Sequence, residues 1–215
     1  MTALGKAIML AAISAVAGTA GTLSFEGTFS TDDQVNLFQL TLNSTTLVTI
    51  QSYGYAGGVM DSTVVPAGGF APDFTLFALV GSDYQEAASD NGGHCGITSA
   101  DPVTGNCDDP YIQTTLNAGT YYLGLSVWDN VPLTGFLADG YTQTGNAGFT
   151  CAEGGVSGQF CDVTDALYSS RTGNWAVSFT EFSDVTNESA PEPSTWWLTL
   201  PAGLAGALFR RRRFK

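Results

Sequence analysis

The sequence is poor in positive charge. It has 7 Lys and Arg residues against 20 Asp and Glu, for a formal net charge of −13 over 215 residues. Lys6 lies near the start and five basic residues lie in the last six positions, so Arg171 is the only lysine or arginine between residues 21 and 190. Nineteen acidic residues share that stretch. Phosphate backbones need Lys and Arg to neutralise them, which excludes nucleic acid as a partner.

The sequence also lacks the motifs of several enzyme classes. His94 is the only histidine, so a zinc site built on several histidines is excluded. There is no Gly-x-Ser-x-Gly nucleophile motif, no phosphate-binding Gly-Lys-Ser/Thr loop and no dinucleotide fingerprint. A glycosidase needs only two carboxylates across a cleft, and it is the enzyme hypothesis that remains. The candidate pairs are Asp32 with Asp33, Asp108 with Asp109, and Asp162 with Asp165.

Charged residues are scarce at 13%, and residues 21–190 show no sustained helical apolar period, which argues against a helical bundle. Glycine-rich turns instead separate β-branched and aromatic runs. The runs are Leu23 to Phe29, Val35 to Leu42, Leu47 to Tyr53, Phe74 to Val80, Thr120 to Trp128 and Trp175 to Phe182. Six or seven such strands predict an all-β domain over residues 21–186, an antiparallel β-sandwich of jelly-roll or immunoglobulin-like arrangement. Two long loops, Gly81 to Pro110 and Asp129 to Arg171, are expected between them.

Each long loop contains one pair of cysteines. Their spacing favours the disulfides Cys95–Cys107 and Cys151–Cys161, each closing a short loop. The alternative, a four-cysteine metal site, fits poorly because there is no Cys-x-x-Cys pair. Disulfides also indicate an oxidising compartment.

The first twenty residues predict export. Lys6 supplies a positive charge, and Ala7 to Val16 form an apolar stretch too short for an ordinary membrane span. Small residues at Ala15-x-Ala17 and Gly18-x-Ala20 suit a signal peptidase. Residues 1–20 are therefore interpreted as a signal peptide, against the alternative of a buried N-terminal helix.

The opposite end combines three elements in order. A linker over residues 187–195 contains the motif Pro191, Glu192, Pro193, Ser194, Thr195, and residues 196–215 hold the apolar stretch Trp196 to Phe209 and the basic cluster Arg210, Arg211, Arg212, Arg213. The arginines are expected to stop transfer and stay cytoplasmic, with the apolar segment in the membrane. The arrangement resembles the PEP-CTERM sorting signal. That resemblance implies processing by exosortase at the inner membrane of a Gram-negative bacterium, and then a place in the cell envelope, on the surface or in the exopolysaccharide matrix. A simple stop-transfer tail is the alternative.

A second resemblance covers about residues 23–182. The motifs are Phe25-x-Gly27-x-Phe29, then Thr31-Asp32-Asp33-Gln34-Val35, and Leu116-x-Ala118-Gly119-Thr120-Tyr121. They resemble one group of PEP-CTERM proteins, and their order is similar to that of bacterial pre-peptidase C-terminal domains, which are β-sandwiches. This implies a fold and a location, without catalytic residues. We therefore expect a non-catalytic structural or binding module, with a secreted carbohydrate-active enzyme as the alternative.

Two kinds of ligand fit the remaining residues. Loop carboxylates and amides could hold Ca²⁺, which would make the domain a calcium-dependent adhesion module. The candidates are Asp83, Asp90, Asn91, Asp108 and Asp109, and without an Asp-x-Asp-x-Asp-Gly loop a solvated acidic surface is the alternative. Exopolysaccharide could stack on Tyr53, Tyr55, Tyr122 or Trp128, although core or rim positions are commoner for aromatic residues.

Overall fold

The structure is a computed structural model that describes residues 21–189. The expected signal peptide, the sorting motif, the apolar stretch and the arginine cluster lie outside the described residues. Within residues 21–189, no helix is long and apolar enough to cross a membrane.

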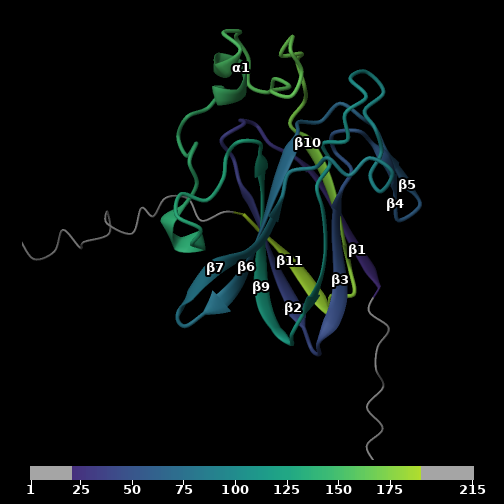
Figure 1. The fold of residues 1–215 in the computed structure, drawn as a ribbon, viewed down its shortest axis with the longest axis vertical. Coiled ribbons are helices and arrows are strands. Elements are labelled where there is room, and N and C mark those ends of the chain that lie inside the picture. The colour runs from purple at the N-terminus through teal and green to yellow at the C-terminus, as the bar shows by residue number, and fades with distance from the viewer. Residues whose placement is uncertain (1–20, 190–215) are drawn as a thin grey trace, which may run out of the picture.

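Two antiparallel sheets pack face to face (Figure 1). The four-stranded sheet has the order β1 (Thr22–Thr28), β10 (Asn174–Thr180), β3 (Thr46–Ser52), β8 (Tyr111–Leu116). The five-stranded sheet has the order β11 (Asp184–Ser189), β2 (Asn36–Leu42), β9 (Gly119–Val127), β6 (Pro72–Val80), β7 (Asp83–Asp90). A small hairpin, β4 (Gly58–Met60) with β5 (Thr63–Val65), a 3₁₀ turn η1 (Leu137–Asp139) and a short helix α1 (Phe149–Glu153) complete the elements.

The connections identify a jelly roll. With the β4–β5 hairpin counted as part of the connection from β3 to β6, every connection except the β6–β7 hairpin carries the chain from one main sheet to the other. Strands β1-β10-β3-β8 face strands β2-β9-β6-β7, and β11 is added beside β2. The all-β sandwich is therefore confirmed, and of the two expected arrangements the jelly roll is the one that forms.

The core follows from the period-2 alternation of the central strands. In β9, Tyr121, Leu123 and Leu125 point between the sheets, while Tyr122 and Gly124 lie on the outer face. The same alternation buries one face of β2, whereas β6 and β10 are buried on both faces over most of their length. A cluster of aromatic rings, including Phe38 and Phe179 with centroids 5.0 Å apart, joins the sheets near their middle.

Two predictions from the sequence were wrong. The stretch from Gly81 was expected to be loop, but Asp83–Asp90 form β7. The domain was expected to end at residue 186, yet β11 continues to Ser189 and pairs with β2 throughout. Residues 187–189 therefore belong to the sandwich and not to the linker.

The long connections gather at the end of the sandwich opposite the start of β1 (Figure 1). The segment with α1 and the segments beside the β4–β5 hairpin lie there. The connection after β9 pairs with the free edge of β7, where Phe136 forms a β-bridge with Gln85, and its Tyr141 reaches the outer face of the five-stranded sheet at Gly124. These two places, the loop end and the outer face, contain the buried polar groups described next.

Candidate functional site

The single basic residue of the domain organises the loop end. The Arg171 guanidinium is 6% exposed and donates from Nη1 to Asp101 Oδ2 at 3.0 Å. Its Nε donates to Asp162 Oδ2 at 2.9 Å, and its Nη2 donates to the same oxygen. The guanidinium also lies over the ring of Tyr55, 4.2 Å from the centroid. We call Arg171, Asp101, Asp162 and Tyr55 the Arg171 cluster.

Charges in this cluster are compensated. Burial alone would raise the pKa of Asp101, but hydrogen bonds from Arg171, Thr104 and Val103 hold it at about 2. Burial alone would lower the pKa of Arg171, but the carboxylates of Asp101 and Asp162 raise it. Asp101 therefore stays ionised, and both carboxylates hold one guanidinium, which makes the cluster a structural tie between distant segments.

A second tie joins β3 to the loop before β8. The buried carboxylate of Asp109 accepts hydrogen bonds from the Ser52 hydroxyl at 2.7 Å, the Ala56 amide at 2.8 Å and the Tyr55 amide at 3.1 Å. Burial nevertheless raises the pKa of Asp109. The hydroxyl of the same Tyr55 donates to Asp162 at 2.9 Å, so the two ties share one residue.

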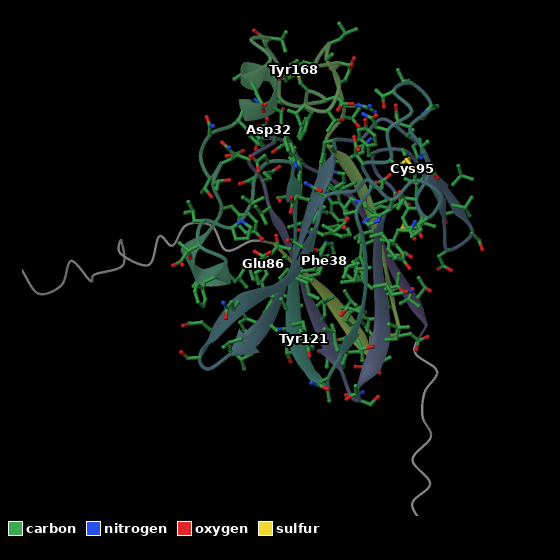
Figure 2. The ribbon with its side chains drawn as sticks, in the orientation of Figure 1. Asp32, Phe38, Glu86, Cys95, Tyr121 and Tyr168 are labelled. Atoms are coloured by element: carbon green, nitrogen blue, oxygen red, sulfur yellow. A yellow bond between two sulfur atoms is a disulfide. The ribbon has the colours of Figure 1, made fainter. Side chains whose placement is uncertain are left out.

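Both predicted disulfides are confirmed. Cys95 pairs with Cys107, and Cys151 pairs with Cys161. The first bond closes the loop that contains Asp101, and the second immediately precedes Asp162. Figure 2 shows Cys95 and Asp32 at the loop end. Two disulfides are typical of a protein that resides in the periplasm or outside the cell.

The carboxylates considered for a glycosidase are bonded within the protein. Asp32 is fully buried and accepts hydrogen bonds from the amides of Gly148 and Thr150 at the start of α1, at 2.5 and 2.9 Å. Asp109 and Asp162 are buried in the two ties described above. Each predicted pair thus has one carboxylate occupied in an internal network, where it is not placed to exchange protons with a substrate.

The five calcium candidates do not form one group. Asp83 and Asn91 are exposed, and Asp108 accepts a hydrogen bond from Thr164 at 2.7 Å. Asp90 is bonded to His94 at 2.7 Å and accepts from the Gly92 and Tyr111 amides, while Asp109 holds three donors. Across residues 21–189, no three His, Cys, Asp or Glu side chains are arranged to hold a metal ion.

The four aromatic candidates for sugar stacking are not aligned. Tyr55 is buried under Arg171, and Trp128 packs partly against it. Tyr122 lies on the outer face of the five-stranded sheet, edge-on to Tyr84 at 4.7 Å between centroids. Tyr53 packs against the β4–β5 hairpin. The structure therefore presents no shared stacking platform among these four residues.

An open groove of about 350 Å³ does exist at the four-stranded sheet. It is lined by Glu26, Gly27, Thr28, Gly54, Val65, Pro66, Asn174, Trp175 and Ala176. Its polar rim comes from the exposed side chains of Glu26, Thr28 and Asn174, and the Thr28 hydroxyl donates to Asn174 Oδ1 at 2.8 Å. The sequence did not point to this groove, because β1, β10 and the hairpin are far apart along the chain.

Sequence reasoning also missed a buried acid on the outer face of the five-stranded sheet. Asp73 in β6 is 5% exposed, and its Oδ1 has no hydrogen-bond partner among residues 21–189. Burial, followed by the charges of Asp129, Glu86 and Asp90, raises the pKa of Asp73 to about 7. A charged residue inside the mostly apolar run from Phe70 to Val80 was the available signal.

No family model and no curated protein matches the sequence. Among solved structures, the chain is similar to the 1.0 Å crystal structure of the pre-peptidase C-terminal domain of a collagenase from Bacillus anthracis. The identity is 11%, the match covers 77% of this chain and 89% of that chain, and the TM-score is 0.33. A likeness this distant supports no argument about function, and the fold described above rests on its own strand order.

Proposed function

We propose that this chain is an exported protein of a Gram-negative bacterium, sorted by exosortase to the cell envelope or the exopolysaccharide matrix. Its jelly-roll domain would serve there as a non-catalytic structural or binding module. The main support is the loop end, where two disulfides close loops and Arg171 binds the buried carboxylates of Asp101 and Asp162. A domain stapled in this way suits an environment outside the cytoplasm.

The groove at the four-stranded sheet is the proposed contact for a neutral polymer such as exopolysaccharide. Carboxylate, hydroxyl and amide groups of Glu26, Thr28 and Asn174 form its rim, and these groups pair well with sugar hydroxyls. The surrounding surface is acidic, so a neutral polymer is a better ligand than an anionic one.

Intact-mass analysis of cell fractions tests the sorting proposal. The expected mature protein lacks about the first 20 residues and ends close to Pro191–Pro193. It should be found in the envelope or matrix fraction, and deletion of the exosortase should retain the longer form in the inner membrane. A full-length cytoplasmic protein would refute the proposal.

Sedimentation with purified exopolysaccharide tests the binding role. Thr28→Ala with Asn174→Ala should weaken retention, whereas Asp83→Asn, on an exposed position of the other sheet, should leave it unchanged. Turnover of the polysaccharide that is lost on changing Asp108, a half-buried member of one candidate pair outside the Arg171 cluster, to Asn would instead establish the glycosidase alternative.

A further inference from the structure

The Asp73 site lies on the outer face of the five-stranded sheet. Asp73 in β6 and Ser126 in β9 are register partners, and their flanking residues Phe74 and Leu125 point into the core. Both polar side chains therefore project outward, side by side. Tyr141 reaches the same face, because its hydroxyl occupies the space that a side chain at Gly124 would fill.

Three buried oxygens at this site lack partners. They are Asp73 Oδ1, Ser126 Oγ and Tyr141 Oη, and no hydrogen bond to any of them is made within residues 21–189. The three residues are 5%, 1% and 6% exposed. A buried polar atom without a partner costs about 1–3 kcal/mol, and a buried charge costs more. We call Asp73, Ser126 and Tyr141 the Asp73 cluster.

The charges that face this cluster are all negative. Glu86 and Asp90 come from β7, and Asp129 follows β9. Tyr141 is the other titratable group, and burial together with the charge of Asp73 raises its pKa. The nearby His94 is bonded to Asp90 rather than to Asp73. Arg171 is committed to Asp101 and Asp162, so no arginine or lysine in the described part of the chain balances Asp73.

A segment with a single buried side chain covers the cluster. Within residues 131–144, which we call the cover segment, Tyr141 is the one buried residue. The segment is also bonded to β7, because the Glu86 amide donates a hydrogen bond to the Gly135 carbonyl at 2.8 Å. Within the cover segment, the amides of Leu133 and Thr142 donate to Gly140 and Val131. The Gln143 amide donates to Asn130 Oδ1 at 2.9 Å and the Thr142 hydroxyl donates to the Asp129 carbonyl at 3.2 Å, so these bonds fix one end of the cover segment. Tyr141 is the one side chain that the segment buries beside Asp73, so its packing there decides whether the segment lies closed over the cluster.

We propose that Asp73 is a proton-operated latch for the cover segment. When protonated, its carboxyl group is neutral, can donate a hydrogen bond toward the neighbouring hydroxyls, and tolerates the apolar enclosure. When the proton leaves, a buried charge faces three other carboxylates, and opening the cover segment admits water to it. The cover segment is thus closed in mildly acidic conditions and opens more often in mildly alkaline ones. This proposal is independent of export and sorting.

Hydrogen exchange of the purified protein at pH 5 and pH 8 tests the latch, after correction for the intrinsic exchange rate. The pKa of about 7 in the closed form, against an ordinary value in the open form, predicts that opening of the cover segment increases roughly 10- to 100-fold at pH 8. Asp73→Asn should remove most of this pH dependence. Asp83→Asn, an exposed acid on β7, should keep it.

Two results would overturn the proposal. One is equal protection of residues 131–144 at both pH values in the unmodified protein. The other is an unchanged pH dependence in Asp73→Asn. If that variant does not fold, NMR titration of the Asp73 carboxyl carbon in the unmodified protein replaces it. A midpoint near 7 is expected, and an ordinary midpoint near 4 refutes the latch.

Discussion

The two buried acidic clusters of this domain differ in how the charge of a buried carboxylate is compensated. In the Arg171 cluster, two buried carboxylates share the one guanidinium of residues 21–189, with Tyr55 beneath it. In the Asp73 cluster, one buried carboxylate faces three others and has no cation. Asp101 in the first cluster remains ionised at neutral pH, whereas Asp73 in the second resists ionisation. Burial alone therefore does not define the role of an acid in this fold, because the nearest charge decides it.

The two clusters accordingly change the stability of the fold in opposite directions as the pH changes. The lowered pKa of Asp101 contributes stability that is present above the ordinary value and is lost as the pH falls toward 2. The raised pKa of Asp73 acts in reverse, since the folded state holds its proton longer than the unfolded state. Its favourable contribution is full below about pH 4 and is lost as the pH rises to 7.

Removing the cation should give the largest effect. Arg171→Met leaves Asp101 and Asp162 buried without a counter-charge, and we expect a loss of about 3–5 kcal/mol in the free energy of unfolding. Urea unfolding at pH 7 measures it. The triple variant with Asp101→Asn and Asp162→Asn should recover much of the loss. A loss below 1 kcal/mol in the single variant would mean that the cluster is not a structural tie.

Opening one disulfide should cost nearly as much. Cys95 and Cys107 are 12 residues apart, and in the chain-entropy model closing such a loop is worth about 3 kcal/mol. Changing both cysteines to Ala should therefore lower the denaturant midpoint. The loop also contains Asp101, so Arg171→Met should cost less in this background than in the intact protein. Simple additivity would show that the disulfide and the Arg171 cluster act separately.

Replacing Asp73 by a neutral residue should remove the loss of folding stability that its ionisation causes as the pH rises. Between pH 5 and pH 8, ionisation of a group whose folded pKa is about 7 costs the folded state about 2.5 kcal/mol. Asp73→Asn should escape that loss, so its stability relative to the unmodified protein should improve as the pH rises. Urea titrations at both pH values measure it, with Asp83→Asn as the matched control. Parallel curves for Asp73→Asn and the unmodified protein would contradict the raised pKa.

The sequence predicted the central strands better than the edges. All six predicted strand runs correspond to observed strands, because two packed layers impose a clear apolar alternation on them. The longer strands that were missed, β7, β8 and β11, all lie at sheet edges. Their side chains are largely exposed or half-buried, so polar residues suffice and the pattern is lost.

The two clusters were harder to predict for different reasons. The disulfide pairing followed from short spacing, but Tyr55, Asp101, Asp162 and Arg171 come from four separate segments that only the fold brings together. A lone arginine among nineteen acids was a usable hint that it is an internal counter-ion. For Asp73, the strand was predicted, whereas the cover segment above it follows no local pattern.

Trimming one hydroxyl from the Arg171 cluster should have a smaller effect. Tyr55→Phe keeps the ring under the guanidinium and removes the hydrogen bonds of its hydroxyl with Asp162 and Thr104, while Asp162 retains its bonds to Arg171. We expect a loss of about 1 kcal/mol at pH 7. Thermal unfolding of this variant beside Tyr53→Phe, whose hydroxyl makes only a long 3.4 Å contact with Ser178, separates the bond from a general effect of the substitution. Equal losses of stability in the two variants would show that the hydrogen bond from Tyr55 to Asp162 contributes no measurable stability.

Calcium should give the smallest effect of all. No three acids among residues 21–189 are arranged as a metal cage, so we expect only weak bridging of surface carboxylates such as the exposed Asp83 and the half-buried Asp108. With a millimolar dissociation constant and millimolar calcium, the gain is about 0.4 kcal/mol, or about 1–2 °C in Tm. Melting in calcium chloride and in sodium chloride of matched ionic strength measures the excess. Equal shifts would leave screening of the acidic surface as the whole effect, because screening depends on ionic strength and a site depends on the ion.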